Sequence, residues 1–225
     1  MQKTSLIDYP GNICDTVFLT GCNFRCPYCH NRELVLGVVA FDSSWPEILA
    51  GLGARAHLLD GVCFSGGEPT LHKELPDWCA QVKELGLSVK VDTNGSNPEL
   101  LEHLISKGLV DYVAMDVKAP KEKYPKVVRM PLDLSKIQRS IDLLRANDVS
   151  YEFRTTVPRS LLGEAELLAM GRWLDGAACW VLQRYRPEHR LDESFHSEEN
   201  DASSWLREMQ NKLSSFVESV TVRGI

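Results

Sequence analysis

The chain lacks several features that mark whole classes of protein. Its 225 residues hold no charged segment followed by an apolar leader, no apolar run of membrane-spanning length, no fixed repeat and no low-complexity linker. A net charge of −6 does not favour the basic surface that binds nucleic acid. These absences predict one cytoplasmic domain that has neither a membrane nor a nucleic acid as its partner.

A fourth cysteine is also missing beside the most unusual motif. The stretch GCNFRCPYCHN holds Cys22, Cys26 and Cys29. Structural zinc normally takes four protein ligands, and His30 follows Cys29 too directly to close the same tetrahedron easily. An electron-transfer cluster would need a distant fourth ligand such as Cys14. Three thiolates otherwise suit a four-iron cluster with one iron left open for a small molecule.

Short β-branched segments alternate with longer helical segments. Two helices have readable starts, because Ser44 and Glu47 have capping-box spacing and Asn97 precedes a first-turn Pro98. Six alternations predict a parallel sheet with right-handed crossovers. A complete eight-fold barrel takes roughly 250 residues, so the pattern favours an α/β fold with a partial, open (β/α)6 barrel. The predicted strands are 16–21, 61–67, 87–95, 110–118, 151–158 and 179–185.

The pattern predicts a single domain over 1–225. An N-terminal segment, 1–15, precedes the barrel core, 16–185, and a loop, a helix and a strand-like tail fill 186–225. The unusual segments TGCNFRC, SGGEPT, DTNG and DVKAP follow the first four predicted strands in turn. Because the carboxyl ends of parallel strands meet at one rim, these segments predict a single site there.

The cysteine motif, with Tyr28 before its last cysteine, resembles the signature of the radical S-adenosylmethionine enzymes. The resemblance implies that Cys22, Cys26 and Cys29 hold one [4Fe-4S] cluster at the C-terminal mouth of the strands. The open iron of that cluster would bind S-adenosylmethionine, and one electron would cleave it to methionine and a hydrogen-abstracting 5′-deoxyadenosyl radical. Tyr28 is then expected beside the adenine.

The segment SGGEPT is similar to the GGE motif of the same family. The resemblance implies that Gly66, Gly67 and Glu68 bind the amino group of the cofactor's methionine. Glycines let the backbone approach closely, and a carboxylate pairs with an ammonium. An ordinary strand-to-helix turn is the alternative interpretation of the glycine pair.

Four segments, TSLIDYPG, CPYCHNREL, DTNG and MDVKAP, resemble the activating enzymes of glycyl radical proteins. The resemblance is strongest to the activating proteins of the anaerobic ribonucleoside-triphosphate reductase. It implies an anaerobic oxidoreductase that abstracts hydrogen from a backbone glycine of this large partner. The alternatives are an activase of the pyruvate formate-lyase type, a radical enzyme that modifies a small molecule, and, outside the class, a non-catalytic iron–sulfur or zinc protein.

Residues 30–62 contain no cysteine, whereas some activases insert a ferredoxin-like module there. A single cluster is therefore expected, with an external low-potential electron donor such as flavodoxin or ferredoxin.

The resemblance implies further contacts around the cofactor. Asp92, Thr93 and Asp116 match positions that hold a monovalent cation beside its carboxylate, where bare acids would otherwise repel it. His30 and Asn31 match residues after the last cysteine and are expected to support the cluster. The remaining cofactor-binding residues are Lys118, Arg154 and Arg186.

Arg186 departs from the family pattern, because a related activase has a cofactor-contacting histidine at the matching place. Two basic segments, 118–129 and 184–190, follow the fourth and sixth predicted strands. Solvated loops are the default interpretation of such segments, and docking of the partner's glycine loop is the alternative.

Overall fold

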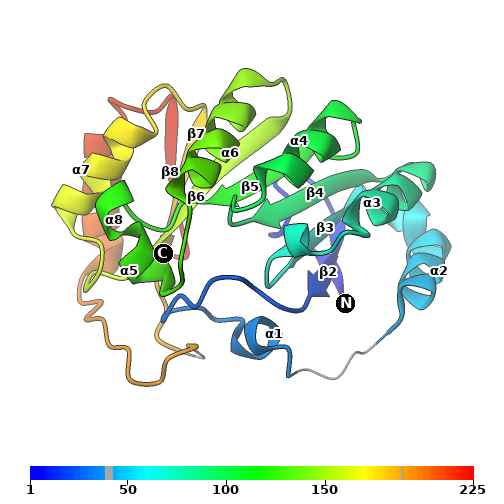
Figure 1. Cartoon of the computed structure of the whole chain (residues 1–225), viewed down its shortest axis with the longest axis horizontal. Coiled ribbons are helices and arrows are strands. Elements are labelled where there is room, and N and C mark those ends of the chain that lie inside the picture. The colour runs from blue at the N-terminus through cyan, green and yellow to red at the C-terminus, as the bar shows by residue number, and fades with distance from the viewer. Residues whose placement is uncertain (39–42, 189) are drawn as a thin grey trace.

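The computed structural model describes residues 1–38, 43–188 and 190–225. Its centre is an eight-stranded sheet in which the strands lie side by side in chain order (Figure 1). The first strand is antiparallel to the second, and every later pair of neighbours is parallel. The strands are β1 (Gln2–Ser5), β2 (Cys14–Leu19), β3 (Gly61–Gly66), β4 (Ser88–Thr93), β5 (Tyr112–Asp116), β6 (Ser150–Val157), β7 (Cys179–Arg184) and β8 (Ser219–Arg223).

Helices follow the strands and lie along the outside of the curved sheet (Figure 1). The predicted capping box is present, because the backbone N–H and the hydroxyl of Ser44 both donate to Glu47 Oε2 at 2.7 Å. The side chain of Asn97 accepts from the backbone N–H of Leu100 at 3.3 Å, as its place before Pro98 predicts. The α-helices are α1 (Arg32–Leu36), α2 (Trp45–Arg55), α3 (Leu75–Glu84), α4 (Pro98–Ser106), α5 (Tyr124–Val128), α6 (Leu134–Ala146), α7 (Glu164–Trp173) and α8 (Ala202–Leu213). Short 3-10 turns are η1 (Ala56–Leu58), η2 (Pro69–Leu71) and η3 (Lys121–Lys123).

The partial, open barrel predicted from the sequence is confirmed. All six predicted strands are present as β2 to β7, with ends within two residues of the expected ones. One strand is added at each edge: β1 lies in the predicted N-terminal segment, and β8 is the strand-like tail. Three of the four residues of β1 are exposed, so that strand carries no alternating apolar signal. Within the described ranges, the outer edges of β1 and β8 pair with no other strand.

The two faces of the sheet differ in polarity, because successive side chains of a strand point to opposite faces. In β4, Val89 and Val91 belong to the apolar core that packs under the helices. Lys90 and Asp92 take the alternate positions and form an ion pair with each other. Glu152 takes the equivalent inward position in β6. The inside of the barrel therefore combines these charged side chains with a small apolar cluster of Tyr9, Cys14 and Cys63.

None of the described helices is long and apolar enough to cross a membrane.

Inside the barrel, β8 is tied to β5 and β6 through one buried carboxylate. Glu152 is 1% exposed. Arg223 donates to both of its oxygens, at 2.7 and 2.6 Å, and the hydroxyl of Tyr112 donates to Oε2 at 3.1 Å. The Arg223–Glu152 ion pair therefore links β8 to β6, and Tyr112 links the same carboxylate to β5.

Replacing Arg223 tests that connection. Arg223→Met should lower the free energy of unfolding by about 2–3 kcal/mol, because it leaves a buried carboxylate without its cation. The double variant Arg223→Met/Glu152→Gln should recover more than half of this loss in urea unfolding. The control is Lys212→Met, which removes the exposed Lys212–Glu164 pair and should cost less than about 1 kcal/mol. Equal losses for Arg223→Met and Lys212→Met would contradict the expectation.

Candidate active site

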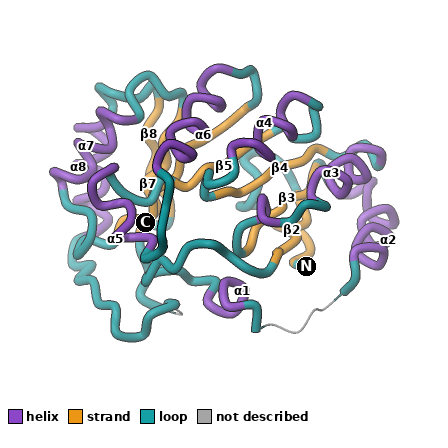
Figure 2. The backbone as a smooth tube through the Cα atoms, in the orientation of Figure 1, coloured by secondary structure: helices purple, strands orange, loops and turns teal. Residues whose placement is uncertain are grey.

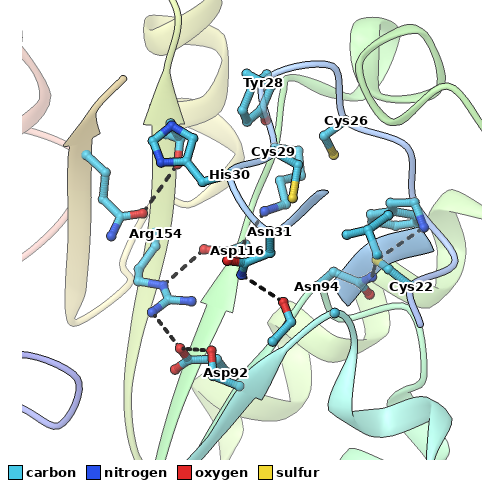
Figure 3. A pocket seen from close by; sticks show the side chains of 18 of the residues that line it. Cys22, Cys26, Tyr28, Cys29, His30, Asn31, Asp92, Asn94, Asp116 and Arg154 are labelled. Carbon is cyan, nitrogen blue, oxygen red and sulfur yellow. Dashed lines mark hydrogen bonds and ion pairs between the residues drawn. The ribbon is translucent and has the colours of Figure 1, made fainter. Parts of the chain in front are cut away.

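A cleft of about 470 Å³ at the carboxyl ends of the strands collects every residue predicted for the site (Figure 3). It also contains residues that the sequence interpretation missed. The predicted residues are Cys22, Cys26, Tyr28, Cys29, Gly66, Gly67, Glu68, Asp92, Thr93, Asp116, Lys118, Arg154 and Arg186, together with His30 and Asn31. The missed residues include Ile7, Ser65, Asn94, Gln183, Arg184 and Arg223.

The segment between β2 and α1 forms one wall of this cleft. It has no regular structure and runs across the opening of the barrel toward α5 (Figure 2). The backbone N–H of Arg25 donates to the carbonyl of Val128 at 2.8 Å, and the ring of Phe24 meets that of Tyr124 edge-on at 6.4 Å. The carbonyl of Pro27 accepts from the backbone N–H of Asp192 at 3.0 Å. These contacts hold the cysteine loop at a fixed place over the strand ends.

The three cysteines of this loop are unpaired thiols that line the cleft. Burial raises the pKa of Cys26 to about 12, and burial also raises the pKa of Cys22 and of Cys29. Because burial raises their pKa, these thiols lose their protons only when a strongly positive group lies next to the sulphur, and iron is such a group. No three His, Cys, Asp or Glu side chains of the described residues are grouped so that they could hold a single metal ion. Three thiols that line one cleft are the kind of ligand that an iron–sulphur cluster takes.

The residues after the last cysteine fasten the loop to two strand ends. His30 Nε2 donates to the carbonyl of Arg186, just beyond β7, at 2.7 Å. Asn31 Nδ2 donates to the carbonyl of Gly66, at the end of β3, at 2.9 Å. Asn94, which sequence reasoning overlooked within DTNG, donates to Asn23 Oδ1 at 2.8 Å. His30 and Asn31 therefore act as braces of the cysteine loop.

Glu68 connects the GGE segment to the end of β4. It is 1% exposed, and burial raises its pKa while hydrogen bonds from Thr70 and Thr93 oppose that rise. Its Oε1 accepts from the backbone and hydroxyl of Thr70, at 3.1 and 2.6 Å, and from the hydroxyl of Thr93 at 2.7 Å. Its Oε2 accepts from the backbone of Asn94 at 2.6 Å. The carboxylate of Glu68 is thus engaged with Thr70, with the hydroxyl of Thr93 and with the backbone of Asn94.

The glycine pair lets two backbone segments touch. The backbone N–H of Glu68 donates to the carbonyl of Gly21 at 2.8 Å, which joins the GGE segment to the start of the cysteine loop. A Cβ on Gly67 would lie 1.9 Å from that carbonyl oxygen. Gly66 has φ +116°, and a Cβ there would lie 2.4 Å from the carbonyl of Leu19. Both positions therefore require glycine.

Five charged side chains form a network at the floor of the cleft, and Figure 3 shows Arg154 between Asp92 and Asp116 at its centre. Arg154 on β6 bridges two strands, since its Nη1 lies 3.1 Å from Asp92 Oδ2 and its Nε lies 3.0 Å from Asp116 Oδ1. Lys118 Nζ lies 2.9 Å from Asp116 Oδ2. Lys90, which the sequence interpretation did not single out, pairs with Asp92 from below.

The cations of this network keep both acids ionised. Burial alone would raise the pKa of Asp116, but Arg154 and then Lys118 outweigh it and lower that pKa to about 2. Arg154 and then Lys90 likewise outweigh burial at Asp92 and lower its pKa. Burial would lower the pKa of Lys118 and of Arg154, but Asp116 reverses the effect and raises both. Asp92, Asp116, Lys118 and Arg154 therefore stay charged at neutral pH.

The two remaining predicted residues lie in the outer part of the cleft. The ring of Tyr28 is buried and packs against Tyr185 and Phe195, with centroids 6.4 and 6.2 Å away. Its hydroxyl has no hydrogen-bond partner among the described residues. The side chain of Arg186 is exposed at the rim. Sequence reasoning overlooked Arg184, two residues earlier, which also lines the cleft.

The basic segment 118–129 is largely occupied by contacts within the chain. Lys121 lies over the ring of Trp173, 5.1 Å from its centroid, and Lys123 lies 2.7 Å from Glu166. Arg129 lies 2.6 Å from Asp192. These contacts give the segment a structural role. The docking hypothesis for 118–129 and 184–190 stays a prediction.

The structure thus combines an open α/β barrel with three unpaired cysteines and a charged network at its mouth. The profile of the Radical SAM superfamily matches residues 16–163, and the chain belongs to that superfamily. Membership implies a [4Fe-4S] cluster and S-adenosylmethionine. The cysteine loop fits the cluster, and the charged floor fits an amino-acid cofactor.

Relatives extend this similarity over nearly the whole chain. A putative glycyl-radical enzyme activating enzyme of Methanocaldococcus jannaschii is 34% identical, and the match covers 98% of this chain and 93% of that protein. The pyruvate formate-lyase-activating enzyme of Clostridium pasteurianum is also 34% identical, over 52% of this chain and 50% of that protein. The crystal structure of Streptococcus suis SuiB bound to precursor peptide SuiA has a TM-score of 0.69 at 9% identity, covering 94% of this chain and 48% of that one. That last likeness concerns the fold alone.

The close contact at Gly67 can be tested by adding one methyl group. Gly67→Ala should displace the start of the cysteine loop and reduce iron incorporation at least about fivefold after anaerobic reconstitution, because a backbone carbonyl cannot yield like a side chain. The control is Gly51→Ala in α2, where nothing lies within 4 Å of the added Cβ. Iron per chain and thermal unfolding should be measured for both. Normal iron content in Gly67→Ala would contradict the expectation.

The lowered pKa of Asp116 predicts a specific pH dependence of stability. Its folded pKa of about 2 lies below the ordinary value of 3.8, so its stabilisation is fully present above about pH 4 and is lost as the pH falls through 2. Between pH 5 and pH 2, the wild type should lose about 2 kcal/mol more unfolding free energy than Asp116→Asn does. Urea unfolding at a series of pH values measures this difference. The control Asp175→Asn, at an exposed position, should follow the wild type; parallel curves for all three proteins would refute the assignment.

Proposed function

We propose that this chain is an activating enzyme of a glycyl radical protein, and that its partner is the anaerobic ribonucleoside-triphosphate reductase. The observation that carries the proposal is the relative with 34% identity over 98% of the chain, a putative activating enzyme of this kind. The motifs TSLIDYPG and MDVKAP support the same conclusion through their resemblance to these activases.

The open side of the barrel suits a large substrate. The turn after β1 carries Leu6 and Ile7, which are 70% and 83% exposed, and Ile7 lines the cleft. Hydrogen bonds from the backbone N–H groups of Ile7 and Asp8 to the hydroxyl of Ser5, at 3.3 and 3.2 Å, hold this turn in shape. Exposed apolar side chains on an ordered turn at a cleft favour contact with another polypeptide.

In this proposal the residues of the cleft divide into four roles. Cys22, Cys26 and Cys29 hold the cluster, and the backbone of Gly66 and Gly67 receives the amino group of the cofactor. The charged floor receives the carboxylate, and Tyr28 borders the adenine. When bound, the cluster and S-adenosylmethionine supply the one-electron cleavage and hydrogen abstraction that the reaction requires.

Lys118, Arg154 and Arg186 complete the cofactor contacts in the proposal. The glycine of the partner enters beside Ile7, which lines the same cleft as the cysteine loop. An external low-potential donor such as flavodoxin or ferredoxin supplies the electron, and the enzyme works in the anaerobic cytoplasm.

The test has two stages. Anaerobically reconstituted and reduced protein should form 5′-deoxyadenosine from S-adenosylmethionine, and Cys26→Ala should form none, because it lacks a cluster ligand. With the anaerobic reductase present, electron spin resonance should detect a glycyl radical, which should vanish when the partner's target glycine is replaced by alanine.

The outcomes distinguish the proposed partner from the alternatives. A radical on pyruvate formate-lyase but not on the reductase would identify the alternative partner, which the Clostridium pasteurianum relative suggests. Cofactor cleavage without a radical on either partner would overturn the activase proposal.

A further inference from the structure

The oxygens of Asp92 and Asp116 are already occupied by donors from the protein. Asp92 Oδ1 pairs with Lys90, and Oδ2 accepts from the hydroxyl of Ser65 at 2.9 Å and from Arg154 at 3.1 Å. Asp116 Oδ1 accepts from Arg154 at 3.0 Å, and Oδ2 from Lys118 at 2.9 Å. An alkali ion between these acids would need such oxygens as ligands. Each of these four oxygens already has a cationic donor from the protein, so an alkali ion would have to share its ligands with Lys90, Arg154 or Lys118.

The charges of this network do not cancel. Three cations, Lys90, Lys118 and Arg154, face two carboxylates, which leaves one positive charge in surplus. Lys90 is 1% exposed and does not line the cleft. Its Nζ also donates to the thiol of Cys63, with Sγ at 3.7 Å. A buried ammonium is costly unless it is paired, so the pairing with Asp92 gives this lysine its function.

We propose that Lys90 is a built-in replacement for the monovalent cation that the family resemblance implied beside the carboxylate of S-adenosylmethionine. Lys90 neutralises Asp92 from below the floor. Arg154 and Lys118 then face the cleft with one carboxylate, Asp116, between them. The surplus positive charge matches the single negative charge of an α-amino acid carboxylate. Lys90 is a positioning residue, since it acts through Asp92 and Arg154 without touching the ligand.

The charge balance also argues against adding a further cation. A free alkali ion would enter a site that is already positive, and it would compete with Lys90 for Asp92 Oδ1. Lys90 is part of the chain, so its positive charge is present at the site whatever salts the solution contains. The inference depends on cofactor binding by the superfamily and not on the identity of the partner protein.

The first experiment needs no variant. Binding of S-adenosylmethionine to anaerobically reconstituted protein is measured by calorimetry in potassium chloride and in tetramethylammonium chloride of equal ionic strength. The dissociation constant should agree within about twofold, because no alkali ion takes part. A dissociation constant more than about tenfold weaker without potassium would overturn the proposal.

The second experiment removes the surplus charge. Lys90→Met should weaken binding about tenfold in tetramethylammonium chloride, and potassium or sodium should restore part of the loss by occupying the vacated place. Lys90→Arg keeps the charge and should remain independent of potassium. Lys83→Met, which removes a lysine paired with Asp111 outside the cleft, should bind like the wild type.

Iron content and thermal unfolding of each variant exclude loss of the cluster or of the fold as the cause. Binding by Lys90→Met that equals the wild type in both salts would overturn the proposal, as would weak binding that neither alkali ion improves. If Lys90→Met does not fold, the comparison of salts with the wild type still decides.

Discussion

The guanidinium of Arg154 joins the ends of three neighbouring strands at the mouth of the barrel. It reaches from β6 to Asp116 on β5 and to Asp92 on β4, whose side chains are 22% and 15% exposed. Lys90 and Lys118 each pair with one of these acids, whereas Arg154 contacts both and lowers the pKa of both. The charged floor therefore depends on this bridge to act as one connected network.

The cysteine loop depends on a different kind of support. It has no regular structure, so its backbone groups are satisfied by contacts with strand ends and with α5. His30 reaches the end of β7 and Asn31 reaches the end of β3. These anchors hold the three thiols in place, although the loop is neither a helix nor a strand. The polar residues beside the cysteines therefore shape the site as much as the cysteines do.

The sequence predicted the architecture and the place of the site because its signals were local. β-branched segments marked β2 to β7, and the order of motifs after each strand located the rim. The edge strand β1 was missed because its side chains are mostly exposed and carry no apolar alternation. Every side chain predicted for the site lines the cleft. The roles of these side chains in binding stay predictions.

What the sequence could not predict were the pairings between distant residues. The GGE motif predicted that Glu68 helps to bind the cofactor's amino group, which stays a prediction, but it did not predict the four hydrogen bonds that tie Glu68 to Thr70, Thr93 and Asn94. Lys90 stands inside a strand that reads as apolar, and only the inward direction of its side chain brings it to Asp92. Such pairings depend on strand register, which a single sequence does not specify at this level.

The unpaired edges of the sheet have a mechanical consequence. In the described part of the chain, no strand bridges β1 and β8, which flank the opening. The width of the opening is therefore set by the twist and coiling of the sheet and not by a ladder of hydrogen bonds. A closed barrel would have to break such a ladder of hydrogen bonds to admit a large substrate. This one can widen or narrow by small rotations between neighbouring strands, with every existing backbone hydrogen bond kept.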